Sequence, residues 1–314
     1  MGPAAANTSH RQPGLVDRLR RAGGLRRSDW VWGYLFLSIN FLGFAIFSLG
    51  PIIASLALSF MGWRLLQPPQ FTGLTNLNQL VGDGMFFQTL LNTAYFVVGY
   101  VPLVTVLSFL LAVLLNRPLR GIGLLRGIYF LPSITLLVSV AMVWHWLLDP
   151  QAGMLNFALH VIGLPSPQWL ADAHWAMPTI IMVAVWQDVG YFAVVYLAGL
   201  QSVPSALYEA ADIDGANAWQ KLTQITVPLM IPTAFFVLVI SLINGWQVFA
   251  LPFLMTQGGP ANSTYTLLLY VYNQAFTSLH MGYASLMSWV LFLIILVVTL
   301  VQWRFAKRGE NVFS

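Results

Sequence analysis

The stretch GMFFQTLLNTAYFVVGYVPLVTVLSFLLAVLLN, residues 84–116, contains no Asp, Glu, Lys or Arg. A helix that crosses the hydrocarbon core of a bilayer, roughly 30 Å thick, needs about 20 predominantly apolar residues, so this stretch is long enough to cross a membrane. It also lacks the pattern that would give a helix one polar face, as the surface helices of a soluble protein have. The stretch therefore predicts a helix that spans a membrane.

Similar stretches recur along the chain. Asp, Glu, Lys and Arg are absent from residues 31–63, 127–148 and 222–303, and Asp188 is the only one of them in residues 173–200. The whole chain is 58% hydrophobic and 8% charged, whereas about 25% of the residues in an ordinary soluble domain are charged. We therefore predict an all-α polytopic membrane protein. Six transmembrane helices are expected, near residues 32–61, 86–116, 122–148, 176–200, 229–254 and 282–304.

The basic residues predict how these helices cross the membrane. Of the 14 Lys and Arg residues, all except Arg64 fall on one side of the six-helix arrangement. Because cytoplasmic loops carry an excess of Lys and Arg, we expect both termini in the cytoplasm. The expected parts are a basic cytoplasmic tail (residues 1–30), a six-helix transmembrane domain (31–305) and a cytoplasmic C-terminal tail (306–314). The N-terminal arginines suit anionic lipid headgroups and not nucleic acid, since no aromatic residue precedes Trp30.

The most polar internal segment is QSVPSALYEAADIDGANAWQKLTQITVPLMIP, residues 201–232. Pro204 favours the first turn of a short helix, Gly215 can end that helix with a positive φ, and Asp214 could cap the next helix. That second helix has an apolar face made of Trp219, Leu222 and Ile225. The pattern predicts a helix–turn–helix elbow. A solvated connector would not need an apolar ridge together with a glycine turn, so we favour a docking surface.

This elbow resembles the EAA motif of the membrane subunits of binding-protein-dependent ABC importers. The matching positions keep the spacing of the motif, and they are Glu209, Ala210, Ala211, Gly215, Ile225, Val227 and Pro228. The family usually has Leu in place of Val227, which is a conservative difference. WQDVGY (residues 186–191) and TQGGP (256–260) also resemble the sugar-permease branch. The resemblance covers residues 32–305 and implies the ABC importer permease fold, with oligosaccharides or glycerol phosphate as the nearest substrate classes.

The resemblance also implies how the chain works and with which partners. The partners would be a second permease subunit, two cytoplasmic ATPase subunits and an extracytoplasmic solute-binding protein, in the inner membrane of a bacterium or archaeon. Closure of the ATPases would switch the paired permeases from inward-facing to outward-facing. The coupling loop (202–228) would dock on an ATPase subunit through Glu209, Ala210, Ala211, Asp214, Gly215, Ile225 and Pro228.

The sequence lacks the motifs of an enzyme. It contains no G-x-x-x-x-G-K-[ST] phosphate-binding loop, so we expect the partner subunits to bind and hydrolyse ATP, and this chain to need no cofactor. Its five His residues are scattered and form no cluster with carboxylates that would predict a metal site. It has no Cys, which excludes disulfides and thiolate ligands.

Polar and aromatic side chains inside the predicted spans are the candidates for a substrate path. Asp188 is the acid that lies well inside a span, where a charge is costly, so it either lines a path or is a structural acid bonded to polar neighbours. The amides near the middle of the fifth span could bind sugar hydroxyls or hold neighbouring helices together. The candidates are Trp186, Asp188, Tyr191, Asn244, Trp246 and Gln247.

Two other classes of protein stay open. A secondary, ion-coupled transporter could use Asp188 as its coupling acid, but such folds tend to show inverted repeats, and we find none in the sequence. A membrane-embedded enzyme, such as a lipid-linked glycosyl transferase, would need acidic or His residues clustered at one interface. The sequence favours an importer permease for a sugar or sugar phosphate over both.

Overall fold

The computed structural model describes residues 27–117 and 120–310. The regular elements of this part are helices, which confirms the all-α prediction, and one short antiparallel hairpin of β1 and β2 lies in a loop. In chain order, with η for a π-helix, the elements are α2 (Arg27–Phe44), η1 (Ala45–Leu49), α3 (Gly50–Ser59), β1 (Met61–Gly62), β2 (Gln70–Phe71), α4 (Thr75–Gly82), α5 (Gly84–Leu115), α6 (Ile122–Ile134), α7 (Leu137–Leu147), α8 (Met154–Val161), α9 (Ala173–Gln201), α10 (Ser205–Ile213), α11 (Ala218–Lys221), η2 (Leu222–Thr226), α12 (Val227–Leu229), α13 (Ile231–Trp246), α14 (Ala250–Met255), α15 (Leu267–Tyr272), η3 (Asn273–Thr277) and α16 (Met281–Glu310).

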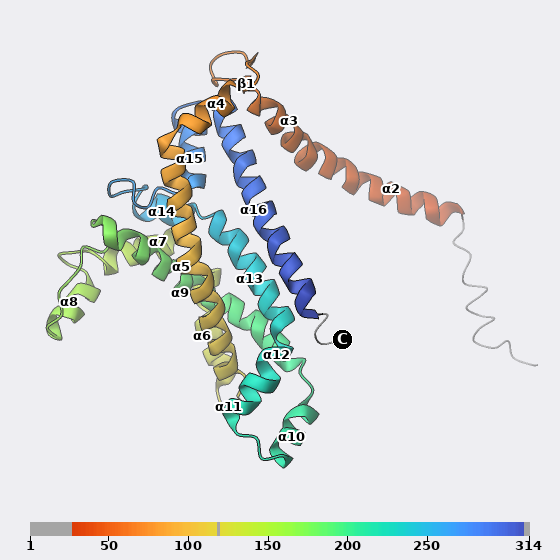
Figure 1. Cartoon of the computed structure of the whole chain (residues 1–314), viewed down its shortest axis with the longest axis vertical. Coiled ribbons are helices and arrows are strands. Elements are labelled where there is room, and N and C mark those ends of the chain that lie inside the picture. The colour runs from red at the N-terminus through yellow and green to blue at the C-terminus, as the bar shows by residue number, and fades with distance from the viewer. Residues whose placement is uncertain (1–26, 118–119, 311–314) are drawn as a thin grey trace, which may run out of the picture. The chain divides into compact units, whose positions relative to one another are not determined.

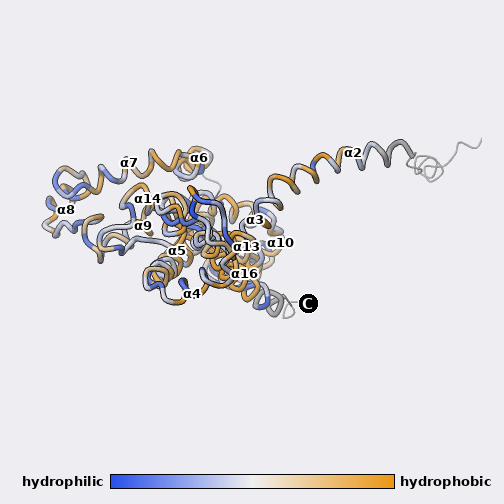
Figure 2. The backbone as a smooth tube through the Cα atoms, turned by 90° about the horizontal axis from the view of Figure 1, so that it is seen from above, coloured by the Kyte–Doolittle hydropathy of each residue, from blue (hydrophilic) through white to orange (hydrophobic). Residues whose placement is uncertain are grey.

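The chain divides into two compact units, of which the first ends at Ala57. This first unit holds α2, η1 and all of α3 except the last two residues, and these helices form one unbroken apolar helical run, Trp32–Ser59, of 28 residues. Figure 2 shows apolar residues along α2 in orange. No residue in the most apolar window of this run is buried, and the Phe47 side chain is 81% exposed. These side chains therefore meet lipid or another protein. Residues 1–26 of the predicted basic tail lie outside the described part of the chain.

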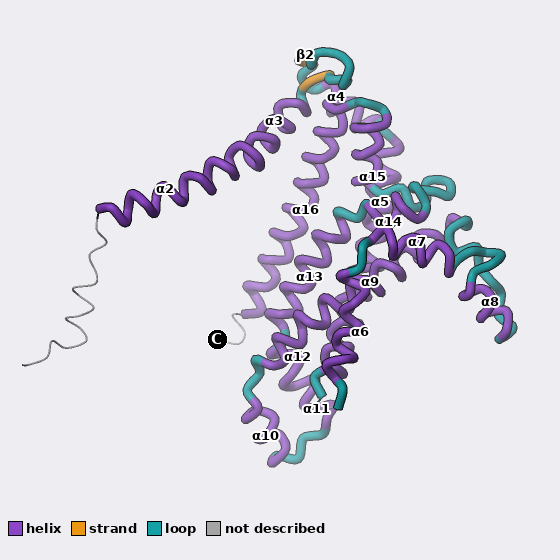
Figure 3. Tube along the Cα trace, turned by 180° about the vertical axis from the view of Figure 1, so that it is seen from behind, coloured by secondary structure: helices purple, strands orange, loops and turns teal. Residues whose placement is uncertain are grey.

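The second unit is built around α5 and α9. These two helices pack along much of their length, α13 lies against both, α6 packs on α9, and α16 packs on α13 and α15. Figure 1 shows α5, α13 and α16 running lengthwise between the α10–α11 elbow at one end and α4 with the hairpin at the other, and Figure 3 shows the same arrangement from behind. Fully buried side chains between these helices include Phe96, Tyr100, Val104, Ile180, Phe192, Tyr196 and Val237.

The predicted spans take two forms. Four helical runs are long and apolar enough to cross a membrane by themselves: Trp32–Ser59, Gly84–Leu115, Ala173–Gln201 and Met281–Arg304. Two further pairs of helices qualify only together, and they are bent by 97° between α6 and α7 and by 64° between α12 and α13. The predicted number of six is reached when each bent pair is counted as one span.

The third predicted span, residues 122–148, is therefore not one straight helix. α6 has 13 residues, which at 1.5 Å per residue give about 20 Å, less than the thickness of the hydrocarbon core. Pro132 lies in its last turn and Thr135 adopts an extended conformation, so the chain turns into α7. α6 also approaches α9 closely, because a Cβ atom on Gly190 would lie 1.8 Å from the carbonyl oxygen of Tyr129.

The fifth predicted span, residues 229–254, is also wrong in its extent. α13 begins after Met230, between Pro228 and Pro232, and ends at Trp246, while Gln247 already leaves the helix. The predicted path residues of this span consequently lie at the end of a helix and not in its middle. Gly245 does not break the helix but gives room to α5, since a Cβ atom there would lie 3.2 Å from the Val97 side chain.

The ends of the second unit differ in their basic residues. Arg126 of α6 donates a hydrogen bond of 2.9 Å to the carbonyl oxygen of Leu115, the last residue of α5. Arg64 lies at the opposite end, where its backbone forms an isolated bridge with His280. α16 continues to Glu310, so residues 306–310 of the predicted C-terminal tail prolong the last helix, and residues 311–314 lie outside the described part.

At the end away from the elbow, one carboxylate joins three elements. Asp83 caps α5 by accepting hydrogen bonds from the backbone N–H groups of Met85 and Phe86. Its Oδ2 also accepts hydrogen bonds from the hydroxyls of Tyr270 in α15 (2.7 Å) and Tyr283 in α16 (2.6 Å). Burial raises the pKa of Asp83, but these hydrogen bonds together outweigh burial and hold the pKa below its ordinary value.

Replacing this carboxylate should destabilise the fold in a pH-dependent way. Hydrogen bonds to a charged group contribute about 1.5–3 kcal/mol each, so Asp83→Asn should lower the free energy of unfolding by about 2 kcal/mol at neutral pH. Because the folded pKa is lowered, this stability is present above the unfolded pKa of about 4 and is lost as the pH falls through the folded value. Thermal unfolding in detergent should therefore show a gap between the two proteins that narrows below about pH 4. Asp172→Asn is the control, since Asp172 caps α9 through the His174 N–H alone, and an equal loss in both variants would contradict the role of the tyrosines.

Candidate functional site

The elbow is two short helices with a tight turn between them. α10 follows Pro204 and ends at Ile213, and the positive φ predicted for Gly215 is confirmed at +75°. The Ala216 N–H donates to the carbonyl oxygen of Ala211 over 2.9 Å, which closes the turn in the manner of a helix C-terminus. The Tyr208 hydroxyl and Thr226 Oγ1 lie 3.0 Å apart and tie α10 to η2. The elbow is thus a shaped surface.

The residue that caps the second helix of the elbow is not the predicted one. Asp214 is the C-terminal flanking residue of α10, and α11 is capped by Asn217 in a capping box. Asn217 Oδ1 accepts a hydrogen bond from the Gln220 backbone N–H, and the Asn217 backbone N–H donates one to Gln220 Oε1. A cap must stand immediately before the first helical residue, and α11 begins at Ala218, too far along the chain for Asp214. Lys221 joins the two helices through an ion pair of 2.6 Å with Asp212.

The predicted docking residues lie on the outside of the elbow. Glu209, Ala210, Asp214 and Gly215 are exposed, while Ala211, Ile225 and Pro228 are half-buried. The predicted apolar face is only partly exposed, since Leu222 and Ile225 are half-buried. Trp219, the third residue of that face, is 70% exposed, and Ile213 of α10 is 88% exposed. Sequence analysis missed Ile213, which falls between two acids in a segment that is otherwise polar.

A polar cavity of about 350 Å³ lies between α5, α9 and the end of α13. α5 and α9 contribute their middle residues to it, so it lies well inside the spanning helices. Its lining combines amide and carboxylate groups with aromatic rings. The lining residues are Phe96, Tyr100, Leu137, Ala184, Gln187, Asp188, Asn244, Gln247, Val248, Phe249, Ala250 and Leu251.

Asp188 is held in this cavity by a tyrosine. The Tyr100 hydroxyl donates a hydrogen bond of 2.5 Å to Asp188 Oδ2, and Tyr100 itself is buried to 1% exposure. Asp188 remains half-buried and lines the cavity. The carboxylate is thus partnered by a neutral donor, as an acid inside a membrane requires.

The cavity exists because a helix ends beside it. Gln247, Val248 and Phe249 lie outside the helices and connect α13 to α14, and the carbonyl oxygen of Val248 accepts a hydrogen bond of 3.0 Å from Thr266 Oγ1. Irregular backbone at membrane depth occurs where it is covered by protein or lines a cavity. The Asn244 and Gln247 side chains are exposed at this break and line the cavity.

The structure brings together three of the six predicted path residues. Asp188, Asn244 and Gln247 share the cavity, whereas Trp246 is half-buried and packs against the apolar cores. Tyr191 is 45% exposed and contacts the Phe192 ring at 5.2 Å.

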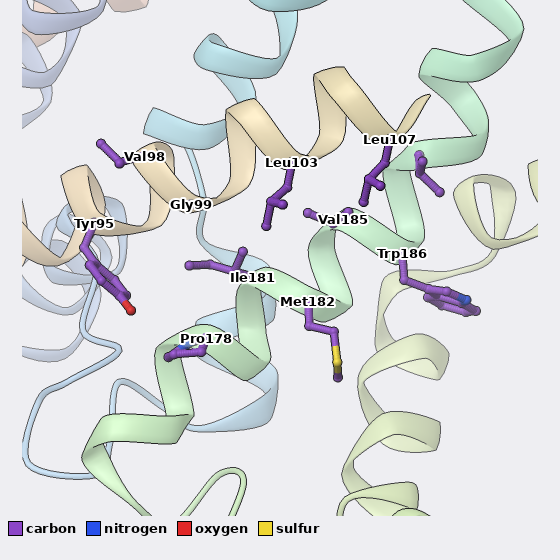
Figure 4. Close-up of a pocket in the computed structure, with 11 residues that line it drawn as sticks. Tyr95, Val98, Gly99, Leu103, Leu107, Pro178, Ile181, Met182, Val185 and Trp186 are labelled. Carbon is purple, nitrogen blue, oxygen red and sulfur yellow. The ribbon is translucent and has the colours of Figure 1, made fainter. Parts of the chain in front are cut away.

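Trp186 lies in a different place. Figure 4 shows it at the edge of an apolar groove of about 600 Å³ between α5 and α9, with Tyr95 at the other end and Leu103, Ile181 and Met182 between them. Its ring contacts that of Trp144 at 5.4 Å.

Sequence analysis missed Tyr100 and Phe249 as cavity residues. Tyr100 lies in an apolar helix with no pattern that sets it apart, and its partner Asp188 is 88 residues away. Phe249 lies in what reads as a continuous apolar run. The position of the helix end, which the sequence does not mark with Pro or Gly at residues 247–249, would have been needed to find it.

Comparisons with known proteins agree on one kind of protein. Residues 86–309 match the model of a family described as binding-protein-dependent transport system inner membrane component. A protein named as a probable ABC transporter permease, YesP of Bacillus subtilis (strain 168), is 34% identical over 92% of this chain and 94% of its own length. The lactose transport system permease protein LacF of Rhizobium radiobacter is 36% identical over 91% of this chain and 97% of its own.

A solved structure is similar over nearly the whole chain. The crystal structure of a bacterial alginate ABC transporter in complex with an alginate pentasaccharide-bound periplasmic protein contains a chain that is 26% identical to this one. The two superpose with a TM-score of 0.80, and the match covers 94% of this chain and 97% of the other.

Proposed function

The chain belongs to the family of inner membrane components of binding-protein-dependent transport systems, and we propose that it serves as a permease subunit of an ABC importer for a sugar. It would form the translocation path with a second permease subunit. The observation that carries the proposal is the polar cavity in the middle of the spanning helices, in a chain that also has an exposed elbow with an EAA-like sequence. The relative named for lactose transport and the alginate transporter support a sugar as the cargo.

The elbow is the proposed contact with an ATPase subunit. Exposed apolar side chains such as Ile213 and Trp219 are costly in water and are typical of a surface that a partner covers. Glu209 and Asp214 add exposed acids that suit basic groups on that partner. In this proposal ATP binds and is hydrolysed on two such ATPase subunits. The chain itself would then be no enzyme and would need no cofactor.

The opposite end is the proposed entrance. The alginate transporter was solved with a periplasmic protein that carries a pentasaccharide, and we expect a solute-binding protein to deliver the cargo to this chain at the end that holds α4 and the hairpin. The proposed path then reaches the cavity of Asp188, Asn244 and Gln247, where the carboxylate and the amides would bind sugar hydroxyls. Trp186, Tyr191 and Trp246 lie outside this cavity and are left out of the proposed path.

The proposed orientation places both termini and the elbow in the cytoplasm. The excess of basic residues near the elbow end supports it. A reporter that is active only in the cytoplasm should be active when fused after Ser314 and inactive when inserted beside Gln168. Equal activity at both positions would contradict the six-span arrangement.

Changes at the elbow should separate ATP hydrolysis from transport. Glu209→Lys reverses a charge at the proposed contact, and Gly215→Pro cannot adopt the φ of +75° that the turn needs. Removing one partner of a buried charge pair at an interface costs about 2–5 kcal/mol, and we propose that Glu209 forms such a pair with the ATPase subunit, so uptake per complex in reconstituted vesicles should fall by about tenfold or more. Gln224→Lys, exposed in the same loop but outside the motif, is the control. Normal ATP-coupled uptake by both elbow variants would exclude this docking surface.

Asp188→Asn separates an importer path from ion coupling. If the carboxylate lines the path as an acceptor, the amide keeps the shape of the cavity, and ATP-driven uptake should continue at a rate about ten- to a hundredfold lower, for one lost charged hydrogen bond. Vesicles in which ATP and the proton gradient are varied independently provide the measurement. Uptake driven by the proton gradient alone in the unmodified complex would favour the secondary transporter and overturn the importer.

A further inference from the structure

The lining of the cavity contains one acidic side chain and no basic one among the described residues. Among the described residues that line it, Asp188 is the charged one, and the Lys, Arg and His side chains of the described chain contribute nothing to the lining. The other polar groups are neutral: the Tyr100 hydroxyl and the amides of Gln187, Asn244 and Gln247. A ligand in this cavity therefore faces a carboxyl group, and the negative charge of its ionised form is offset by no described cation in the lining.

The carboxylate is free to contact a ligand. Tyr100 donates to Oδ2 only, and no described hydrogen bond reaches Oδ1. Asp188 is half-buried, so its accessible part faces the cavity that it lines. A carboxylate oxygen in this position is a strong acceptor for a ligand hydroxyl.

Aromatic rings indicate what shape of ligand fits beside these groups. Phe249 lines the cavity and stacks on Phe253 with ring centroids 5.3 Å apart. The Tyr272 ring lies 5.1 Å from Phe249, and Phe276 lies 5.1 Å from Tyr272. Phe276 is 61% exposed, so a continuous strip of four rings leads from the cavity to the surface of η3. Flat apolar faces next to amides and a carboxylate suit the C–H faces and the hydroxyls of a pyranose ring.

Together these observations define the class of cargo. We propose that the cavity takes uncharged saccharides and excludes anionic ones, and that Asp188 is the residue that discriminates between them. The inference rests on the proposed function and narrows its substrate from sugars in general to neutral sugars. Like charges repel strongly in a partly desolvated site, because the effective dielectric constant is far below that of water. Asp188 would thus weaken the binding of an anionic saccharide by repulsion, while a hydroxyl of a neutral saccharide would donate a hydrogen bond to it.

This proposal separates the chain from one of the two transporters whose cargo is named above. Lactose is uncharged, whereas alginate is an acidic polysaccharide. The expected cargo of this chain is of the first kind. Sugar phosphates, which the sequence alone left open, are of the second kind and are excluded.

The test measures binding to the assembled complex without a solute-binding protein, so that the selectivity of that protein plays no part. The probes are two matched pairs, glucose with glucuronate and cellobiose with cellobiouronate, in which a CH₂OH group is replaced by a carboxylate. Apparent dissociation constants come from the rise in the thermal unfolding midpoint with probe concentration, at constant ionic strength. The unmodified complex should bind the neutral member of a pair about tenfold more tightly or better.

Asp188→Asn should bring that ratio close to one, since the amide keeps the shape and removes the charge. Asp149→Asn is the matched control: Asp149 lies in the loop after α7, lines a different cavity, and uses its carboxylate to accept the N–H groups of Gln151 and Ala152. It should keep the preference of the unmodified complex.

Two results would overturn the proposal. One is the absence of a preference for the neutral member in the unmodified complex, including the absence of any shift with all four probes. The other is a preference that persists in Asp188→Asn. ATP-driven uptake of the cargo from its own solute-binding protein is measured in parallel. If uptake proceeds while the charge preference is absent, this inference fails and the importer function stands. If the charge preference and the ATP-driven uptake are both absent, the importer function is refuted as well.

Discussion

A backbone N–H or C=O group that lies in hydrocarbon must find its hydrogen bond within the protein, because lipid offers no partner. Within a straight helix the backbone groups bond to one another. At the break after α13 and at the start of α15, some backbone groups need a partner outside the helix. There the Val248 carbonyl accepts from Thr266, and the Leu267 N–H donates to Thr93 Oγ1 over 2.8 Å. The threonine of α5 and the loop before α15 thus make an interruption of the fifth span possible, and this interruption opens the cavity.

The same helix, α5, links three levels of the second unit. Its first turn is capped by Asp83, which also binds two tyrosines from α15 and α16. Its middle supplies Tyr100 to Asp188, and its last carbonyl, that of Leu115, accepts from Arg126 near the elbow. A helix held at both ends and in the middle presents Tyr100 at a defined place. The position of the carboxylate in the cavity therefore depends on contacts far from it.

Sequence patterns predicted correctly those features of the structure that depend on residues close together in the chain. The long apolar runs mark α5, α9 and α16 to within a few residues, apart from the C-terminal extension of α16 to Glu310. The glycine turn of the elbow has the positive φ that its sequence requires. The patterns failed at the ends of elements: the 97° bend after α6 follows a Pro that an apolar run conceals, and Asn217 took the cap assigned to Asp214. Both errors arise because several residues near a helix boundary can end or cap a helix. The packing of the helices decides which of them does so.

By itself, the sequence predicted a chain that spans a membrane, the apolar segments long enough to cross it and the place of the elbow, because apolar length and turn residues act over a few neighbouring positions. It also marked Asp188, since an acid in an apolar run is visible without a fold. Only the tertiary structure decided that Asn244 and Gln247 join Asp188 while Trp186 and Trp246 do not, and that Tyr100 is the donor. Those relations connect residues on different helices, and they depend on how the helices pack and where α13 ends, which no local pattern contains.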